Sequence, residues 1–218
     1  MSAARSVILE GIRSALGGTG VAAPADGGRA QTVPSRARPA RPVAAFVENA
    51  ERAGCTVQRV ADVNAVPEAV AAFIARHELG DAVRRAPEPI LETIPWPRQS
   101  AMAIEVGAVR DGDRIAITAA AAGVAETGTL VLSSGPDRAI LNAFLPEAHI
   151  VILSSGDVVG SYEESWTRLG AGADGGWPPR TVTWVTGPSR TADIEQTLIV
   201  GVHGPSLIHV IVVGDEEA

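Results

Sequence analysis

Helical segments alternate with short β-branched runs along the first half of the chain. A helical pattern over residues 43–53 precedes an alternating strand pattern at 55–60, and a helix beginning at Pro67 precedes short strand patterns at 81–85 and 101–106. Parallel strands need a crossover connection, which is usually a helix. We therefore predict an α/β domain over residues 43–218, with a central, mostly parallel sheet flanked by helices.

The second half of the chain is more apolar. Strand patterns occur at 114–118, 129–132 and 149–153, and we predict helices at 137–144, with Asp137 as N-cap, and at 162–169. Over residues 181–213 the pattern predicts a strand, a Gly-Pro turn, a short helix, a glycine turn and a last strand. Such units present binding residues at a sheet edge in α/β proteins.

The first 42 residues differ in character from the rest. Residues 1–16 carry the spacing of an amphipathic helix, which packs on the domain or docks on a partner chain. Residues 17–42 are rich in Gly, Pro and Arg, and we interpret them as a linker. We find no signal-peptide pattern and no apolar run of about 18 residues, so we expect a cytoplasmic protein without a membrane span.

Composition excludes several classes of function. A formal net charge of −7 argues against a nucleic-acid partner, which would need a basic face. Cys55 is the only cysteine, so the chain cannot ligate an iron–sulfur cluster by itself. The four histidines lack metal-ligand spacing, and we expect no bound metal. The dinucleotide, P-loop and nucleophile-elbow patterns are absent as well.

The first candidate site is the AETGT segment, residues 125–129, which lies between apolar strands. If it is buried, Glu126 can act as an acid, a base or a nucleophile. Gly128 would let the backbone approach a ligand closely. The alternative is that Glu126 caps a helix or pairs with an arginine. We predict Glu126 as catalytic and the three residues that follow it as ligand-binding: Thr127, Gly128 and Thr129.

Two further candidate segments lie near the end of the chain. Backbone N–H groups, hydroxyls and an arginine in residues 187–195 suit a carboxylate or a phosphate, although an ordinary capped helix has the same pattern. His203 lies between turn glycines, where it can titrate near neutral pH or serve only a structural role. We predict His203 as catalytic and a second ligand-binding set: Gly187, Ser189, Arg190, Thr191, Asp193 and Gly204. All these segments are expected to meet in one pocket for a small carboxylate or another anion.

Two motifs resemble the LUD-domain family: AETGTLVL at 125–132 and GPSRTADIEQTLIVGVHGP at 187–205. A looser resemblance covers about residues 43–213. The resemblance implies a fold like that of glucosamine-6-phosphate isomerase, ribose-5-phosphate isomerase and CoA transferases. It also implies a role in oxidising L-lactate to pyruvate, alongside iron–sulfur partner proteins that would hold the clusters.

Three functions follow as expectations. The first is a component of a lactate utilization system, as the resemblance implies, with no cofactor bound by this chain. The second is a free-standing acyl- or CoA-transferase-like enzyme that uses Glu126 as nucleophile. The third is a small-acid-binding module without catalysis. Whether this chain is itself an enzyme stays open at this point, as does the possibility of a homo-oligomer.

Overall fold

A computed structural model describes residues 3–15, 39–96, 102–171, 179–192 and 198–214. The chain divides into two units, residues 1–35 and residues 36–218. The first unit contains helix α1 (Ala3–Ala15), whose side chains Val7 and Ile8 are exposed. Most of the linker expected at residues 17–42 lies outside the described residues, which begin again at residue 39.

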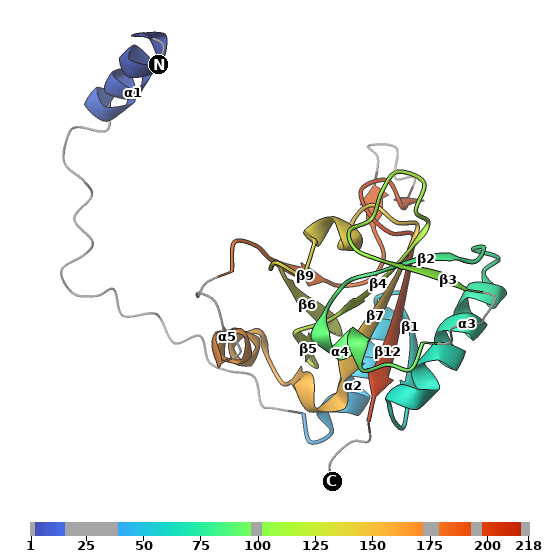
Figure 1. Ribbon diagram of the computed structural model, residues 1–218. Coiled ribbons are helices and arrows are strands. Elements are labelled where there is room, and N and C mark those ends of the chain that lie inside the picture. The colour runs from blue at the N-terminus through green and yellow to red at the C-terminus, as the bar shows by residue number, and fades with distance from the viewer. Residues whose placement is uncertain (1–2, 16–38, 97–101, 172–178, 193–197, 215–218) are drawn as a thin grey trace. The chain divides into compact units, whose positions relative to one another are not determined.

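The second unit is built on a parallel sheet of six strands (Figure 1). Its order is β1-β12-β7-β4-β2-β3, and every neighbouring pair is parallel. The strands are β1 (Thr56–Val60), β2 (Ala82–Arg85), β3 (Ala103–Val106), β4 (Ile115–Ala119), β7 (Ala148–Ser154) and β12 (Leu207–Val213). The predicted α/β class with a central, mostly parallel sheet is confirmed.

Both faces of this sheet are buried, which explains why its strands read as continuous apolar runs. Along β7, Ile150 and Ile152 belong to one core cluster, whereas Val151 and Leu153 belong to the other. This division follows from the alternation of side chains along a strand. Helix α3 (Val66–Arg76) and the single turn α4 (Pro89–Glu92) contribute to the first cluster, and helix α2 (Pro42–Arg52) contributes to the second. A 3-10 turn, η1 (Val63–Ala65), precedes α3.

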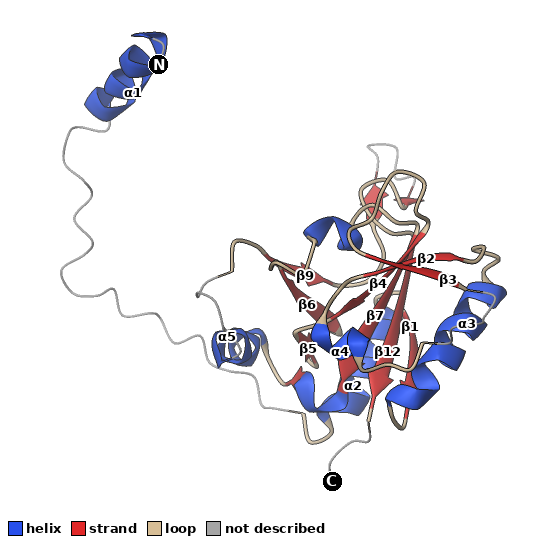
Figure 2. Cartoon of the chain, in the orientation of Figure 1, coloured by secondary structure: helices blue, strands red, loops and turns tan. Residues whose placement is uncertain are grey.

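A second, smaller sheet lies beside the first (Figure 2). Its order is β8-β5-β6-β9, formed by β8 (Val158–Val159), β5 (Ala122–Val124), β6 (Thr129–Ser133) and β9 (Val182–Val185). Strands β5 and β6 form an antiparallel hairpin, and β9 pairs antiparallel with β6. Helix α5 (Tyr162–Ala171) follows β8, which a 3-10 turn, η3 (Ser155–Asp157), connects to β7. Sequence analysis did not predict β5.

Two predicted helices are wrong. In place of a helix over 137–144 the chain forms a tight turn, in which Gly135 and Arg138 exchange backbone hydrogen bonds, and the 3-10 helix η2 (Ile140–Ala143). The Asp137 side chain therefore has no helix to cap.

The short helix expected after the Gly-Pro turn is also absent from the described part of that segment. Strand β10 (Arg190–Ala192) instead pairs antiparallel with β11 (Leu198–Val200), and residues 193–197 lie outside the described residues. The Ser189 carbonyl accepts a hydrogen bond from the Gly201 N–H across the base of this hairpin. Cross-strand pairing thus takes the backbone groups that a helix would have used. None of the described helices is long and apolar enough to cross a membrane.

Candidate functional site

The AETGT segment forms the turn between β5 and β6 and packs against the end of α2. Gly128 has φ +68°, and a Cβ atom there would overlap the backbone of Asn49 and Ala50. The Asn49 side-chain amide donates a 2.8 Å hydrogen bond to the Ala125 carbonyl. Gly128 therefore has a packing reason in this fold that does not involve a ligand.

A cluster of four hydroxyl groups joins this turn to the strand before the second motif. Thr129 Oγ1 lies 2.7 Å from Thr186 Oγ1, 2.7 Å from Thr127 Oγ1 and 2.9 Å from the Tyr162 hydroxyl. The Thr127 hydroxyl donates to the Tyr162 oxygen over 3.1 Å. Thr129 is fully buried, so these bonds offset the loss of its hydration. The cluster holds residues 127–129 against the end of β9.

The candidate segment at residues 187–195 also lies beside the turn that contains His203. The Ser189 N–H donates to the Pro205 carbonyl over 2.9 Å, and the His203 N–H donates to Ser189 Oγ over 3.3 Å. Ser189 Cβ lies 3.4 Å from the position of a Cβ on Gly204. The segments at 187–195 and 201–205 thus contact each other, whereas the single pocket expected for them and the AETGT turn stays a prediction.

The end of α2 and the two residues after it contact the AETGT turn and also the segment that begins at Gly187. A Cβ on Gly187 would be 3.0 Å from the Ala53 carbonyl carbon, and a Cβ on Gly54 would be 3.3 Å from Arg190 Cζ. Burial raises the pKa of the nearby Cys55 thiol to about 11, against the opposing effects of a Gly187 backbone hydrogen bond and the Arg190 charge.

The catalytic and binding roles of these residues stay predictions. Glu126 is half-buried, and its backbone N–H donates a hydrogen bond to the Gly160 carbonyl. His203 is exposed. Thr191 lies in β10, and Asp193 lies outside the described residues. None of the predicted site residues within the described ranges lines the cavity described next.

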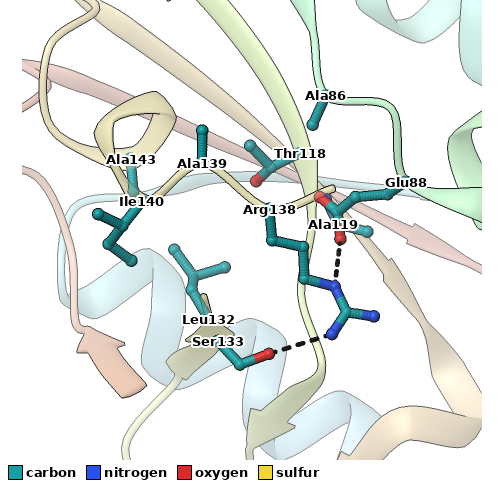
Figure 3. A pocket seen from close by; sticks show the side chains of 10 residues that line it. All are labelled: Ala86, Glu88, Thr118, Ala119, Leu132, Ser133, Arg138, Ala139, Ile140 and Ala143. Carbon is teal, nitrogen blue, oxygen red and sulfur yellow. Dashed lines mark hydrogen bonds and ion pairs between the residues drawn. The ribbon is translucent and has the colours of Figure 1, made fainter. Parts of the chain in front are cut away.

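A cavity with an empty volume of about 290 Å³, including its open mouth, lies at the carboxyl ends of β2 and β4 (Figure 3). Ligands of open α/β sheets bind outside the carboxyl ends of the strands. The walls are mainly apolar, and four polar side chains from different parts of the chain also line the cavity. The apolar residues are Ala86, Ala119, Leu132, Ala139, Ile140 and Ala143, and the polar residues are Glu88, Thr118, Ser133 and Arg138.

Glu88 and Arg138 form the charged part of the cavity. Glu88 Oε1 accepts a 2.9 Å hydrogen bond from the Ala119 N–H, and Glu88 Oε2 lies 3.1 Å from Arg138 Nε. The Glu88 side chain is 5% exposed, whereas that of Arg138 is 47% exposed. Burial raises the pKa of Glu88 above its usual value, although the Ala119 N–H and Arg138 act in the opposite direction. The carboxylate is thus held at the inner end of a pair whose cation reaches solvent.

The turn at Gly135–Arg138 places this arginine. It follows Ser133, the last residue of β6, whose hydroxyl accepts a 3.3 Å hydrogen bond from Arg138 Nη1. Figure 3 shows the guanidinium between Glu88 and Ser133, with a dashed line to each. Glu88 itself comes from the segment between β2 and α4.

A buried histidine supports the wall of the cavity. Thr118 Oγ1 lies 2.8 Å from His149 Nε2, and His149 is fully buried in β7. Burial lowers the pKa of His149 to about 4, so its ring is neutral near pH 7. The Thr118 side chain is thereby fixed in orientation.

Sequence analysis missed Glu88 and Arg138. Glu88 stands between Pro87 and Pro89 in a segment that reads as a surface connection, and Arg138 stands where a helix was expected. One signal was available, because Glu88 follows a predicted strand of a parallel sheet directly, where ligand-binding residues gather.

This arrangement suits a small anion. A half-exposed guanidinium beside hydroxyl groups can hold a carboxylate through charge-assisted hydrogen bonds. Within the described ranges, no group of three or more His, Cys, Asp and Glu side chains could hold a metal ion.

Comparison with known families finds the LUD domain, whose model matches residues 43–213. A crystal structure of a DUF162 family protein from Deinococcus radiodurans has the same fold, with a TM-score of 0.61 and 22% identity. This similarity covers 79% of the present chain and 96% of the other.

Several similar proteins are named lactate utilization protein C. The one from Exiguobacterium sp. is 38% identical over 102 residues, which is 46% of this chain and 44% of the relative. The one from Bacillus licheniformis is 34% identical over 134 residues, 57% of this chain and 56% of the relative. The one from Bacillus subtilis is 35% identical over 102 residues, 46% of this chain and 42% of the relative. The match therefore spans about half the length of these relatives.

Proposed function

Because this chain belongs to the LUD-domain family, we propose that it is a component of a lactate utilization system. The observation that carries the proposal is the run of relatives named lactate utilization protein C, at 34–38% identity for the three described above. Each of these matches covers about half of this chain. The family match over residues 43–213 supplies the rest of the support.

In this proposal the chain supports oxidation of L-lactate to pyruvate in the cytoplasm, together with iron–sulfur partner proteins. The electron-carrying clusters belong to those partners, since the single cysteine of this chain cannot ligate one. Cys55 is also buried, directly before β1.

The cavity at the carboxyl ends of β2 and β4 supplies the chemistry that such a role requires. Lactate and pyruvate are small carboxylates with one further oxygen, and the cavity offers an arginine and two hydroxyl groups within apolar walls. An acidic protein needs such a local cation to attract an anion against its net charge of −7.

Growth on L-lactate after deletion of the gene tests the proposal. The deletion strain should grow normally on glucose and poorly on L-lactate, and the wild-type gene should restore growth. Affinity purification of the tagged chain from lactate-grown cells should recover iron–sulfur proteins. Normal growth of the deletion strain on L-lactate, with no iron–sulfur protein recovered, would refute the proposal.

A Glu126→Gln variant in the same strain tests the transferase alternative. That alternative needs a carboxylate nucleophile, which the amide cannot replace. Full restoration of lactate growth by the variant excludes a nucleophilic Glu126 in this function.

A further inference from the structure

The Glu88–Arg138 pair has an asymmetry that a purely structural ion pair does not need. Its anion is buried and its cation reaches solvent at the mouth of a cavity. A buried carboxylate is costly unless it is paired and hydrogen-bonded, and Glu88 has both kinds of partner in the Ala119 N–H and Arg138 Nε. The outer face of the guanidinium remains accessible to an anion from solvent.

We propose that this cavity binds a small 2-hydroxy or 2-oxo monocarboxylate through Arg138, and that Glu88 takes up one proton when the ligand binds. The carboxylate preference rests on Arg138, whereas the 2-hydroxy or 2-oxo group rests on the proposed function in lactate utilization. The hydroxyl groups of Ser133 and Thr118 line the same cavity and are the partners for that second oxygen.

The proton uptake follows from charge. Two carboxylates that share one arginine repel each other, and the burial of Glu88 weakens the screening by solvent, so the protonated form of one becomes favourable. Glu88 is the group that takes the proton, because burial already raises its pKa. The proton comes from solvent to Glu88 Oε2, which then donates a hydrogen bond to the ligand carboxylate in place of accepting one from Arg138 Nε.

Few other charges act on Glu88. Asp137, on the same turn as Arg138, also raises the pKa of Glu88, and Arg138 lowers it. His149 touches the cavity wall only through Thr118 and is neutral near pH 7. Arg85, the last residue of β2, pairs with Glu92 and not with Glu88. Glu88 is therefore the group that takes up the proton when the ligand binds.

Calorimetric titration of the purified full chain tests the inference. L-lactate and pyruvate are titrated at about pH 6, 7 and 8, each in two buffers that differ in ionisation enthalpy. For the wild type, the dissociation constant should rise by about tenfold per pH unit above the pKa of Glu88, and the buffer dependence of the heat should show uptake of about one proton. Acetate, which lacks the 2-hydroxy or 2-oxo oxygen, should bind more weakly.

Three variants separate the roles of the pair. Arg138→Gln should weaken binding by at least tenfold at every pH. Glu88→Gln should bind without pH dependence and without proton uptake, because its amide accepts from the Ala119 N–H but does not titrate. Arg114→Gln is the matched control: its side chain is 49% exposed and paired with Glu147, and it lies outside the cavity. Circular dichroism and thermal unfolding show whether each variant is folded.

Each outcome bears on the inference. Wild-type affinity in Arg138→Gln overturns the site, and pH-independent binding by the wild type overturns the proton uptake even if Glu88→Gln does not fold. Equal affinity for acetate and L-lactate overturns the preference for a second oxygen. If deletion abolishes growth on L-lactate but the purified chain binds no acid, this inference fails and the proposed function stands. If the deletion strain grows normally on L-lactate but the purified chain binds the acid as described, the proposed function fails and the binding site stands.

Discussion

Substitution of Gly128 by alanine tests the packing of the AETGT turn on α2. The backbone at Gly128 has φ +68°, which costs an L-residue roughly 1–2 kcal/mol. The added Cβ would also overlap helix backbone, with Ala50 Cα at 2.6 Å, and backbone cannot rotate away as a side chain can. Overpacking of this kind costs about 1–3 kcal/mol more. The free energy of unfolding should therefore fall by about 2–5 kcal/mol.

Gly80→Ala is the matched control. Gly80 also has positive φ, at +91°, but an added Cβ there meets no atom within 4 Å. Its substitution should cost only the conformational term, roughly 1–2 kcal/mol. Urea unfolding followed by circular dichroism measures both variants, with an unchanged m-value as the sign that the same transition is compared.

The difference between the two alanine variants isolates the contact with α2. If Gly128→Ala and Gly80→Ala lose the same stability, the turn does not pack on the helix backbone as described. The loss at Gly128 would then come from its positive φ alone and not from packing.

Three other predictions follow from buried groups. Burial lowers the pKa of His149 to about 4, so the unfolded chain binds more protons than the folded one between about pH 6.5 and 4. The free energy of unfolding therefore falls as the pH falls through this window. His149→Gln should reduce that loss by up to roughly 3 kcal/mol, measured by urea unfolding at pH 7 and pH 4. Tyr162→Phe removes the hydroxyl that contacts Thr127 and Thr129 and should cost about 1–3 kcal/mol in the same assay, and an unchanged stability would contradict the cluster. Because burial raises the pKa of Cys55 to about 11, a thiol reagent at about pH 8 should label it only in denaturant, and rapid labelling of the folded chain would show an accessible thiolate.

The central sheet was predictable from the sequence because its signal is local. Runs such as the one in β7 are apolar on both faces, which is typical of a strand covered on both sides. Helix α2 shows its buried stripe at Val43, Phe46 and Ala50, with helical spacing. These features need no knowledge of what packs against them.

The errors occur where long-range contacts decide the local structure. Residues 190–192 carry polar groups that suit a capped helix, but their pairing with residues 198–200 makes them a strand. Asp137 has the character of an N-cap, yet the chain turns back at Arg138 and places the guanidinium over Glu88. Tertiary pairing outweighs a local preference of about 1 kcal/mol in such cases.

The candidate site was predicted only in part, for a related reason. The turn at residues 127–129 contacts Thr186, which directly precedes the predicted segment 187–195. The single pocket expected for these segments stays a prediction. Glu88 gave no local signal of burial, because its neighbours are prolines and its cover comes from β4 and the turn at Arg138. A buried carboxylate is recognised by what surrounds it in space.

The position of α2 beneath two sequence-distant motifs limits how members of this family can be recombined. Its last turn contacts Gly128, and the residues that follow it contact Gly187 and Arg190. A chimaera with a crossover between residues 54 and 125 would take the helix from one parent and both motifs from the other. Crossovers that keep residues 42–54 together with 125–129 and 187–205 preserve these contacts, and they define the segment set that is inherited as one unit.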